Sequence, residues 1–130
     1  MTNYEIHCTI PGGGVPILQV HCGVRLETND VQRLGAELKL CVQGFSGRAF
    51  ALLLDTRNVR ETTREALQLL KRLQKWALHR GMVRLAHVVR FPAMAGKLQA
   101  SYRDRGLTTT VDAFTEIRPA HRFLDEGGLS

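Results

Sequence analysis

Residues 49–81 read AFALLLDTRNVRETTREALQLLKRLQKWALHRG, and this stretch decides the fold. Its first part, 49–54, is a continuous apolar run closed by Asp55, which is typical of a strand buried on both faces of a parallel sheet. Its second part begins after Thr62 and Thr63 and repeats apolar residues at the spacing of one helix face. The stretch therefore predicts a buried strand, a short charged link and an amphipathic helix.

The chain before this stretch predicts a hairpin and a helix. Residues 3–10 and 17–24 alternate as strands around a Gly/Pro loop, which indicates an antiparallel hairpin within residues 1–24. A helix follows, with Thr28 or Asn29 as its cap. Its inner face is predicted to carry Val31, Leu34, Leu38 and Val42.

The chain after this stretch continues the alternation. We predict a strand at 84–89, a helix from Pro92 to Gly106, a strand at 109–114 and a short helix at 116–124. The inner face of the helix after Pro92 is predicted to carry Met94, Leu98 and Tyr102.

This order, strand-strand-helix-strand-helix-strand-helix-strand-helix, predicts an α/β fold. Strands that alternate with helices indicate a single mixed, mostly parallel sheet of about five strands with right-handed crossovers. The first hairpin would add one antiparallel edge. We expect one domain over residues 1–130, with residues 125–130 as a frayed tail.

Composition limits the functional classes. The formal charge of +6, from 18 Lys+Arg against 12 Asp+Glu, favours acidic partners. Nucleic acid is not the expected one, because zinc-finger spacing, RNA-binding aromatic signatures and long Lys/Arg runs are absent from the sequence. No stretch has the roughly 20 apolar residues of a membrane span. Three widely spaced cysteines and the lack of a secretory pattern predict a cytoplasmic protein with reduced thiols.

Neither a metal site nor catalysis is expected. His7-Cys8 and His21-Cys22 lie on predicted strands, where adjacent side chains point to opposite faces, so they supply too few ligands for zinc. The candidate bases are His87, His121, Asp55 and Glu61. No catalytic or cofactor motif joins them, although an enzyme of this fold would bring Asp55 and Arg90 together at the carboxyl ends of the strands. We therefore predict a non-enzymatic protein without a cofactor.

The turn before the central helix carries the best functional candidates. Thr62-x-x-Glu65 has the form of a capping box, which predicts Thr62 as the cap of the helix. Thr63 would then be the exposed first helical residue. A phosphate on Thr63, or a bound anion beside it, would be stabilised by the helix dipole and by nearby arginines.

A basic stripe is predicted beside these threonines. At helical spacing its members share the outward side of the central helix, and a solvated face without function is the simpler interpretation. The predicted partner-binding members are Arg60, Arg64, Lys71, Lys75 and His79, with Arg72 beside them.

The sequence resembles the STAS domain of anti-sigma-factor antagonists and sulfate transporters. In that family an apolar strand leads through a short link to Asp-Ser-Ser-Gly at a helix start, and LLLDTRNVRETTREALQLL follows this layout. Later matching segments are Pro92-Ala93-Met94, Lys97-Leu98, Gly106-Leu107 and Phe114-x-x-Ile117-x-x-Ala120. The resemblance covers nearly the whole chain.

This resemblance implies a regulatory protein-interaction module with an anti-sigma or kinase-like partner. In antagonists of the family the second serine is phosphorylated by the partner kinase, a role that would fall on Thr63, with Thr62 as its neighbour. The sequence departs from the motif, since Glu61 replaces aspartate, threonines replace the serines and Arg64 replaces glycine. Arg60 also stands where an apolar residue is usual.

A divergent branch of the same fold gives an alternative. The segments RLAHVVRFPAM and IRPAHRFLDE also resemble CRAL-TRIO-like lipid carriers, which lack the serine motif. That branch implies a pocket for a small ligand, either a lipid or an anionic metabolite. Both alternatives are compatible with a homodimer.

Overall fold

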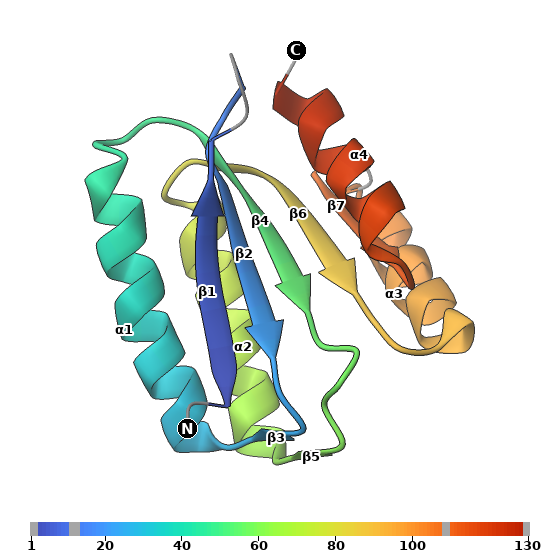
Figure 1. Cartoon of the computed structure of the whole chain (residues 1–130). Coiled ribbons are helices and arrows are strands. Elements are labelled where there is room, and N and C mark those ends of the chain that lie inside the picture. Colours follow the sequence, from blue (N-terminus) through green and yellow to red (C-terminus); the bar gives the residue numbers. More distant parts are fainter. Residues whose placement is uncertain (1–2, 11–13, 108–109, 129–130) are drawn as a thin grey trace.

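The elements of the chain follow the predicted alternation of strands and helices (Figure 1). A computed structural model describes residues 3–10, 14–107 and 110–128. Within these ranges two strands of two residues each are added to the predicted order. The predicted α/β class is confirmed.

Five strands form one mixed sheet in the spatial order β1-β2-β4-β6-β7. They are β1 (Tyr4–Thr9), β2 (Ile17–Cys22), β4 (Phe50–Asp55), β6 (Met82–Val88) and β7 (Val111–Phe114). β1 is antiparallel to β2, and the other neighbouring pairs are parallel, as predicted. All six residues of β4 are buried, because strands flank it on both sides and helices cover both of its faces.

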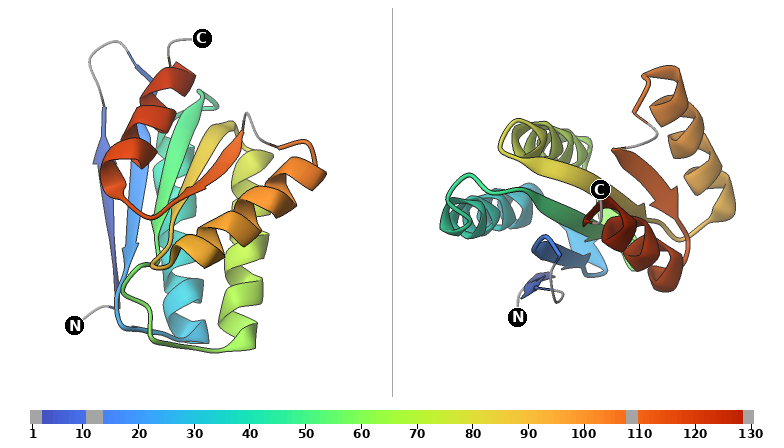
Figure 2. Two further views of the ribbon diagram at one scale, coloured as in Figure 1. Left: turned by 90° about the vertical axis from the view of Figure 1, so that its right-hand side faces the viewer. Right: turned by 90° about the horizontal axis from the view of Figure 1, so that it is seen from above.

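The helices form a layer on each face of the sheet (Figure 2). Three pack on one face, and the fourth packs on the other. They are α1 (Thr28–Gly44), α2 (Arg64–Leu78) and α3 (Pro92–Asp104) on the first face and α4 (Ile117–Gly128) on the second. Within the described residues no helix is long and apolar enough to cross a membrane.

α4 covers only part of its face. It packs against β4, β6 and β7, and its Ala120 and Leu124 close a small core there. On the same face β1 and β2 present polar side chains that the described helices do not cover. We call this region the open sheet face, and it consists of Glu5, His7, Thr9, Gln19 and His21.

An additional small sheet and the start of α1 differ from the prediction. β3 (Arg25–Leu26) pairs in parallel with β5 (Glu61–Thr62), a small sheet that was not predicted because two-residue strands leave no periodic signal. The cap of α1 is Glu27, not Thr28 or Asn29. The Asp30 carboxylate accepts a hydrogen bond from the Glu27 backbone N–H at 2.8 Å, which fixes the helix start one residue earlier.

The C-terminal half contains two further corrections. Met94 is 48% exposed, and Ala95 takes its predicted inward place, because the buried side of α3 follows Ala95, Leu98 and Tyr102. α4 continues to Gly128, so it includes residues predicted as tail. The remaining tail residues 129–130, part of the hairpin loop (11–13) and Thr109 lie outside the described residues.

Candidate functional site

The link between β4 and α2 is fastened to the end of the first hairpin. The Val24 carbonyl accepts hydrogen bonds from the backbone N–H groups of Arg60, at 2.8 Å, and Glu61, at 3.0 Å. Arg25 and Glu61 also form an exposed ion pair at 2.9 Å. These contacts, together with the β3–β5 pairing, hold Glu61 and Thr62 in an extended conformation.

Thr63, and not Thr62, caps α2. The Thr63 hydroxyl accepts a hydrogen bond from the Ala66 backbone N–H at 3.0 Å, and Thr63 itself has extended backbone angles. The predicted capping box of Thr62 and Glu65 is wrong, because pairing with β3 keeps Thr62 in a strand and delays the helix by one residue. Both threonines are exposed, so a partner or a modifying enzyme can reach either residue.

Two helix N-termini meet beside Thr63. The hydroxyl oxygens of Thr63 and Thr28 lie 3.5 Å apart, although α1 and α2 begin far apart in the sequence. Each helix start carries free N–H groups and the positive end of its dipole. An anion attached to Thr63 would therefore be stabilised by two helices instead of the single helix that was predicted.

The solvent face of α2 carries most of the predicted basic stripe. Arg64, Lys71, Lys75 and His79 are exposed, and their spacing places them on the side opposite the buried Ala66, Leu70 and Ala77. Among the described residues none of these four forms an ion pair with a carboxylate. Arg72 is also exposed on this helix.

Arg60 is separate from the stripe. Its guanidinium donates to the carbonyls of Arg57, at 2.9 Å, and Val59, at 3.3 Å, so it folds back over its own loop. The structure therefore brings four of the five predicted partner-binding residues together on α2.

Two leucines border the stripe. Leu67 is 46% exposed and Leu78 is 39% exposed, although both belong to a helix that packs on the core. A partner protein could bury these apolar side chains and be attracted by the unpaired cations beside them. We call this region the α2 surface, and it consists of Thr63, Arg64, Leu67, Lys71, Lys75, Leu78 and His79.

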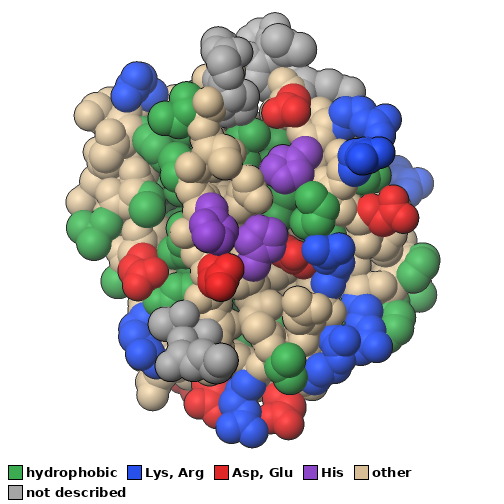
Figure 3. Space-filling model, viewed as in Figure 1, with side chains coloured by type: hydrophobic (Ala, Val, Ile, Leu, Met, Phe, Trp, Pro, Cys, Tyr) green, Lys and Arg blue, Asp and Glu red, His purple; other side chains and the backbone are tan. Residues whose placement is uncertain are grey.

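A second polar cluster lies at the edge of the open sheet face, where histidine, acidic and basic side chains gather (Figure 3). Asp55, at the end of β4, is buried, and its carboxylate accepts hydrogen bonds from Arg57 at 3.0 Å through two guanidinium nitrogens. His21 Nδ1 lies 2.9 Å from the same carboxylate. His7 lies next to His21, with 6.1 Å between the ring centres.

Burial and hydrogen bonds oppose each other at Asp55. Burial alone would raise the pKa of Asp55, but hydrogen bonds from Arg57 and His21 outweigh it and hold the pKa below its ordinary value. The carboxylate therefore remains charged and fully engaged, so it stabilises the end of β4.

A neighbouring half-buried pair joins β6 to the link. His87 Nε2 lies 3.1 Å from the Thr56 hydroxyl. Burial lowers the pKa of His87 to about 4, so this imidazole is neutral at physiological pH. It therefore holds the link in place without adding charge.

The other candidate catalytic residues are dispersed. Glu61 pairs with Arg25, His121 is half-buried on α4, and Arg90 lies over the Phe91 ring. Within the described residues no hydrogen bond or ion pair joins Arg90 to Asp55, so the predicted convergence of these two is not observed. In the same part of the chain no three His, Cys, Asp or Glu side chains are placed to hold a metal ion.

The cluster around Asp55 was missed from sequence because its members are distant in the chain. His21 and Asp55 are 34 residues apart and meet only because β2 lies beside β4 in a register that pairs them. The one local signal was an aspartate closing an apolar strand.

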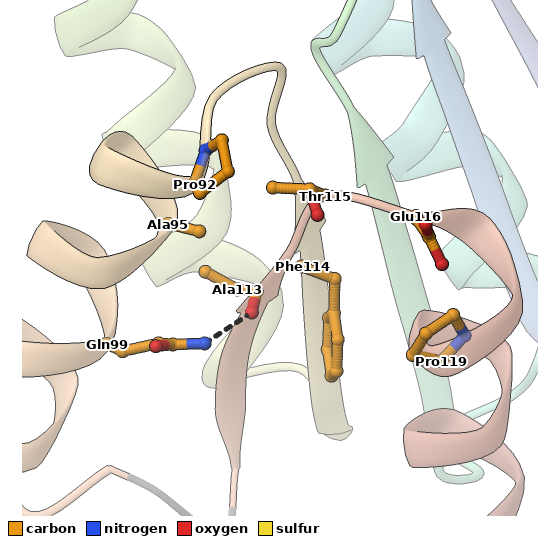
Figure 4. Close-up of a pocket in the computed structure, with 8 residues that line it drawn as sticks. All are labelled: Pro92, Ala95, Gln99, Ala113, Phe114, Thr115, Glu116 and Pro119. Atoms are coloured by element: carbon orange, nitrogen blue, oxygen red, sulfur yellow. Dashed lines mark hydrogen bonds between the residues drawn. The ribbon is translucent and has the colours of Figure 1, made fainter.

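A pocket of about 330 Å³ opens between α3, the end of β7 and α4 (Figure 4). Its walls are mostly small and apolar, with Gln99, Thr115 and Glu116 as the polar members. Gln99 donates to the Ala113 carbonyl at 2.8 Å, which fixes its amide at the wall. The volume is at the lower end of the range of about 300–1,000 Å³ for ligand sites.

Comparison with known proteins identifies the fold. No family model and no curated protein sequence matches the chain. A similar solved structure is an uncharacterised protein of the DUF3478 family with a SpoIIAA-like fold, from Shewanella loihica PV-4. The similarity covers 95% of each chain, with a TM-score of 0.73 and 13% sequence identity. The chain therefore has a SpoIIAA-like fold, as the STAS resemblance predicted.

Proposed function

We propose that this chain is a cytoplasmic, non-enzymatic regulatory module that docks a partner protein through the α2 surface. The observation that carries the proposal is the combination on one helix face of exposed cations without carboxylate partners and two exposed leucines. The cluster around Asp55 differs, because the Asp55 carboxylate is already bonded to Arg57 and His21.

The chemistry of the α2 surface favours an acidic protein with an apolar patch. Lys71 and Lys75 supply charge that steers association, while Leu67 and Leu78 supply apolar area whose burial would stabilise a complex. A nucleic acid would use the cations but would leave the leucines exposed. The STAS-like layout favours an anti-sigma factor or a related kinase as the partner of this chain.

Thr63 is the proposed switch of the docking surface. A phosphate there would add about −1.5 to −2 charges beside two helix N-termini and would offset at least half of the positive charge that Arg64, Lys71 and Lys75 give the α2 surface. An acidic partner would then be attracted less strongly. Asp and Asn both cap helices well, so Thr63→Asp and Thr63→Asn keep the cap and differ only in charge.

A capture experiment with matched charge reversals tests docking. The chain is immobilised and exposed to extract from its own organism, and Lys71→Glu/Lys75→Glu is compared with Lys97→Glu/Arg103→Glu, which makes the same charge change on exposed positions of α3. We expect a partner that wild type and the α3 variant retain, and that the α2 variant and Thr63→Asp lose. Equal capture by all variants would place docking elsewhere.

The pocket supports a second candidate, a small-ligand carrier. Its walls combine apolar side chains with the fixed Gln99 amide, which suits a small amphipathic molecule, and the carboxylate of Glu116 disfavours an anionic metabolite. Native mass spectrometry of gently purified protein should then show a co-purified mass that Thr115→Phe displaces. Only the mass of the bare chain in both samples would count against a carrier.

A further inference from the structure

The two edge strands of the sheet, β1 and β7, differ in whether their outward backbone groups are hydrogen-bonded. On β7 the outward backbone groups are already bonded: the Ala113 N–H donates to the Asp112 carboxylate and its carbonyl accepts from Gln99, both at 2.8 Å. The Val111 N–H donates to the Leu107 carbonyl, also at 2.8 Å. The outward N–H groups of Val111 and Ala113 are therefore both bonded, and neither can donate to a new strand. The β7 edge is closed to further pairing.

The β1 edge is open. The Gly23 N–H donates to the Asn3 carbonyl at 2.7 Å, which fixes the alternation of the β1–β2 ladder: odd residues of β1 bond to β2. The outward N–H and C=O groups therefore belong to Tyr4, Ile6 and Cys8. Within the described residues no hydrogen bond reaches these groups, and no described element lies beyond β1 in the view from above (Figure 2).

β1 also lacks the features that block edge pairing. It contains no proline and no lysine, and it pairs with β2 over six residues without a bulge. A free edge of this kind is a template for an additional strand. We propose that β1 pairs in antiparallel orientation with β1 of a second copy of this chain, which joins two five-stranded sheets into one.

Charge selects a single register for this pairing. Outward groups belong to even residues, so in an antiparallel β1–β1 pair even residues lie opposite even residues. In the registers that overlap most of β1, the numbers of two opposed residues add to 10, 12 or 14. The first would place Glu5 opposite Glu5, and the last would place His7 opposite His7, where like side chains gain nothing or repel. The register that adds to 12 places Glu5 of each copy opposite His7 of the other, so the Glu5–His7 contact that each chain makes at 3.3 Å is joined to that of its partner in one complementary cluster.

This register also matches the apolar face of β1. Ile6 lies at the two-fold axis opposite its own copy, on the side of the sheet that packs against the core. Tyr4 faces Cys8 of the second copy on either side. On the opposite side the open sheet faces of the two copies join through His7 and Glu5, so the pairing is isologous, as a closed dimer requires.

A proline substitution tests the edge while leaving the β1–β2 hydrogen bonds in place. The N–H of residue 6 points outward, so Ile6→Pro removes a donor from the proposed interface and none from the β1–β2 ladder. Ile6→Ala is the matched control that keeps the N–H. By light scattering after gel filtration we expect wild type and Ile6→Ala at twice 14.6 kDa, and Ile6→Pro at 14.6 kDa with an unchanged circular dichroism spectrum.

A monomeric wild type, or an Ile6→Pro variant that keeps the dimer mass and a native spectrum, would overturn the proposal. If Ile6→Pro does not fold, Glu5→Lys takes its place. Glu5→Lys should weaken the dimer at least tenfold, and Glu5→Lys/His7→Glu should restore it, because the complementary pair is then reversed. No recovery in the double variant would contradict the register.

Crosslinking measures the register directly. Ile6→Cys in a Cys8→Ser background should form an intermolecular disulfide, because directly opposed residues in a hydrogen-bonded pair lie about 5.5 Å apart at Cα. The control is wild-type Cys8, which is exposed on the same strand. In this register Cys8 lies opposite Tyr4 of the second copy, so the two Cys8 residues are four positions, or about 13 Å, apart along the strands. Crosslinking through Cys8 and not through residue 6 would refute this register.

Discussion

The α2 surface and the cluster around Asp55 both collect charged side chains, but in opposite states. Lys71 and Lys75 are exposed and have no carboxylate partner among the described residues, whereas Asp55 is buried and bonded to Arg57 and His21. Unpaired surface charge contributes little to stability and remains available to a partner. A buried and satisfied carboxylate contributes to stability and has little left to offer a ligand. Substitution of Asp55 should therefore affect folding, whereas substitution of Lys71 or Lys75 should affect binding.

The largest expected effect is a pH dependence from the half-buried His87. The unfolded chain binds a proton at His87 below about pH 6.5, but the folded chain does so only below about pH 4, so acid favours unfolding across this window. The loss is on the order of 3 kcal/mol between these limits. In urea titrations at pH 7 and pH 4, His87→Gln should lose less stability than wild type, while the exposed His79→Gln should behave as wild type. Equal losses in all three proteins would contradict a His87 that stays neutral in the folded chain down to about pH 4.

Removing the Asp55 carboxylate should have the next largest effect. Asp55→Ala leaves Arg57 and His21 without their partner and should cost about 2 kcal/mol at neutral pH, since both can still reach water. The pKa of Asp55 is lowered in the folded state, so its contribution is present at neutral pH and is lost as the pH falls through that lowered pKa. The gap between wild type and variant in denaturation midpoint should therefore narrow towards pH 3. A constant gap would assign the loss to packing.

The helix cap gives a smaller effect that separates the two threonines. Thr63→Ala removes the acceptor of the Ala66 N–H and should cost about 1 kcal/mol. Thr62→Ala is the matched control, because the Thr62 side chain makes no cap bond to α2, and it should change the free energy of unfolding by less than half of that amount. A larger loss at Thr62 would restore the capping box predicted from sequence.

The smallest stability effect is expected on the α2 surface. Lys71→Ala and Lys75→Ala should each change the free energy of unfolding by less than about 0.5 kcal/mol, since neither cation is paired within the described residues. The same variants should weaken partner capture. Thermal denaturation followed by circular dichroism measures the first expectation, and a clear drop in melting temperature would show that these lysines stabilise the fold.

The fold was largely predictable because its signals are local. The buried run of β4, the helical spacing of α1 and α2 and the Gly/Pro loop of the hairpin each lie within one segment, and together they predict the order of elements along the chain. The basic stripe was predictable for the same reason. Its exception is Arg60, whose side chain is turned back by carbonyls of its own loop.

The features that could not be predicted from the sequence depend on contacts between distant segments. The start of α2 was misplaced by one residue because a two-residue strand, β5, pairs with β3, 36 residues earlier in the chain. The bond between His21 and Asp55 likewise requires the register of β2 against β4. The open β1 edge could not be anticipated either, because it is defined by where the sheet ends.

Lysine footprinting tests docking at the α2 surface most directly. The chain is acetylated with and without the captured partner, and the modification of Lys71, Lys75 and Lys97 is quantified by mass spectrometry. Our account predicts that the partner protects Lys71 and Lys75 and leaves Lys97 on α3 as reactive as in the free chain. Protection of Lys97 with unchanged reactivity at Lys71 and Lys75 would contradict it.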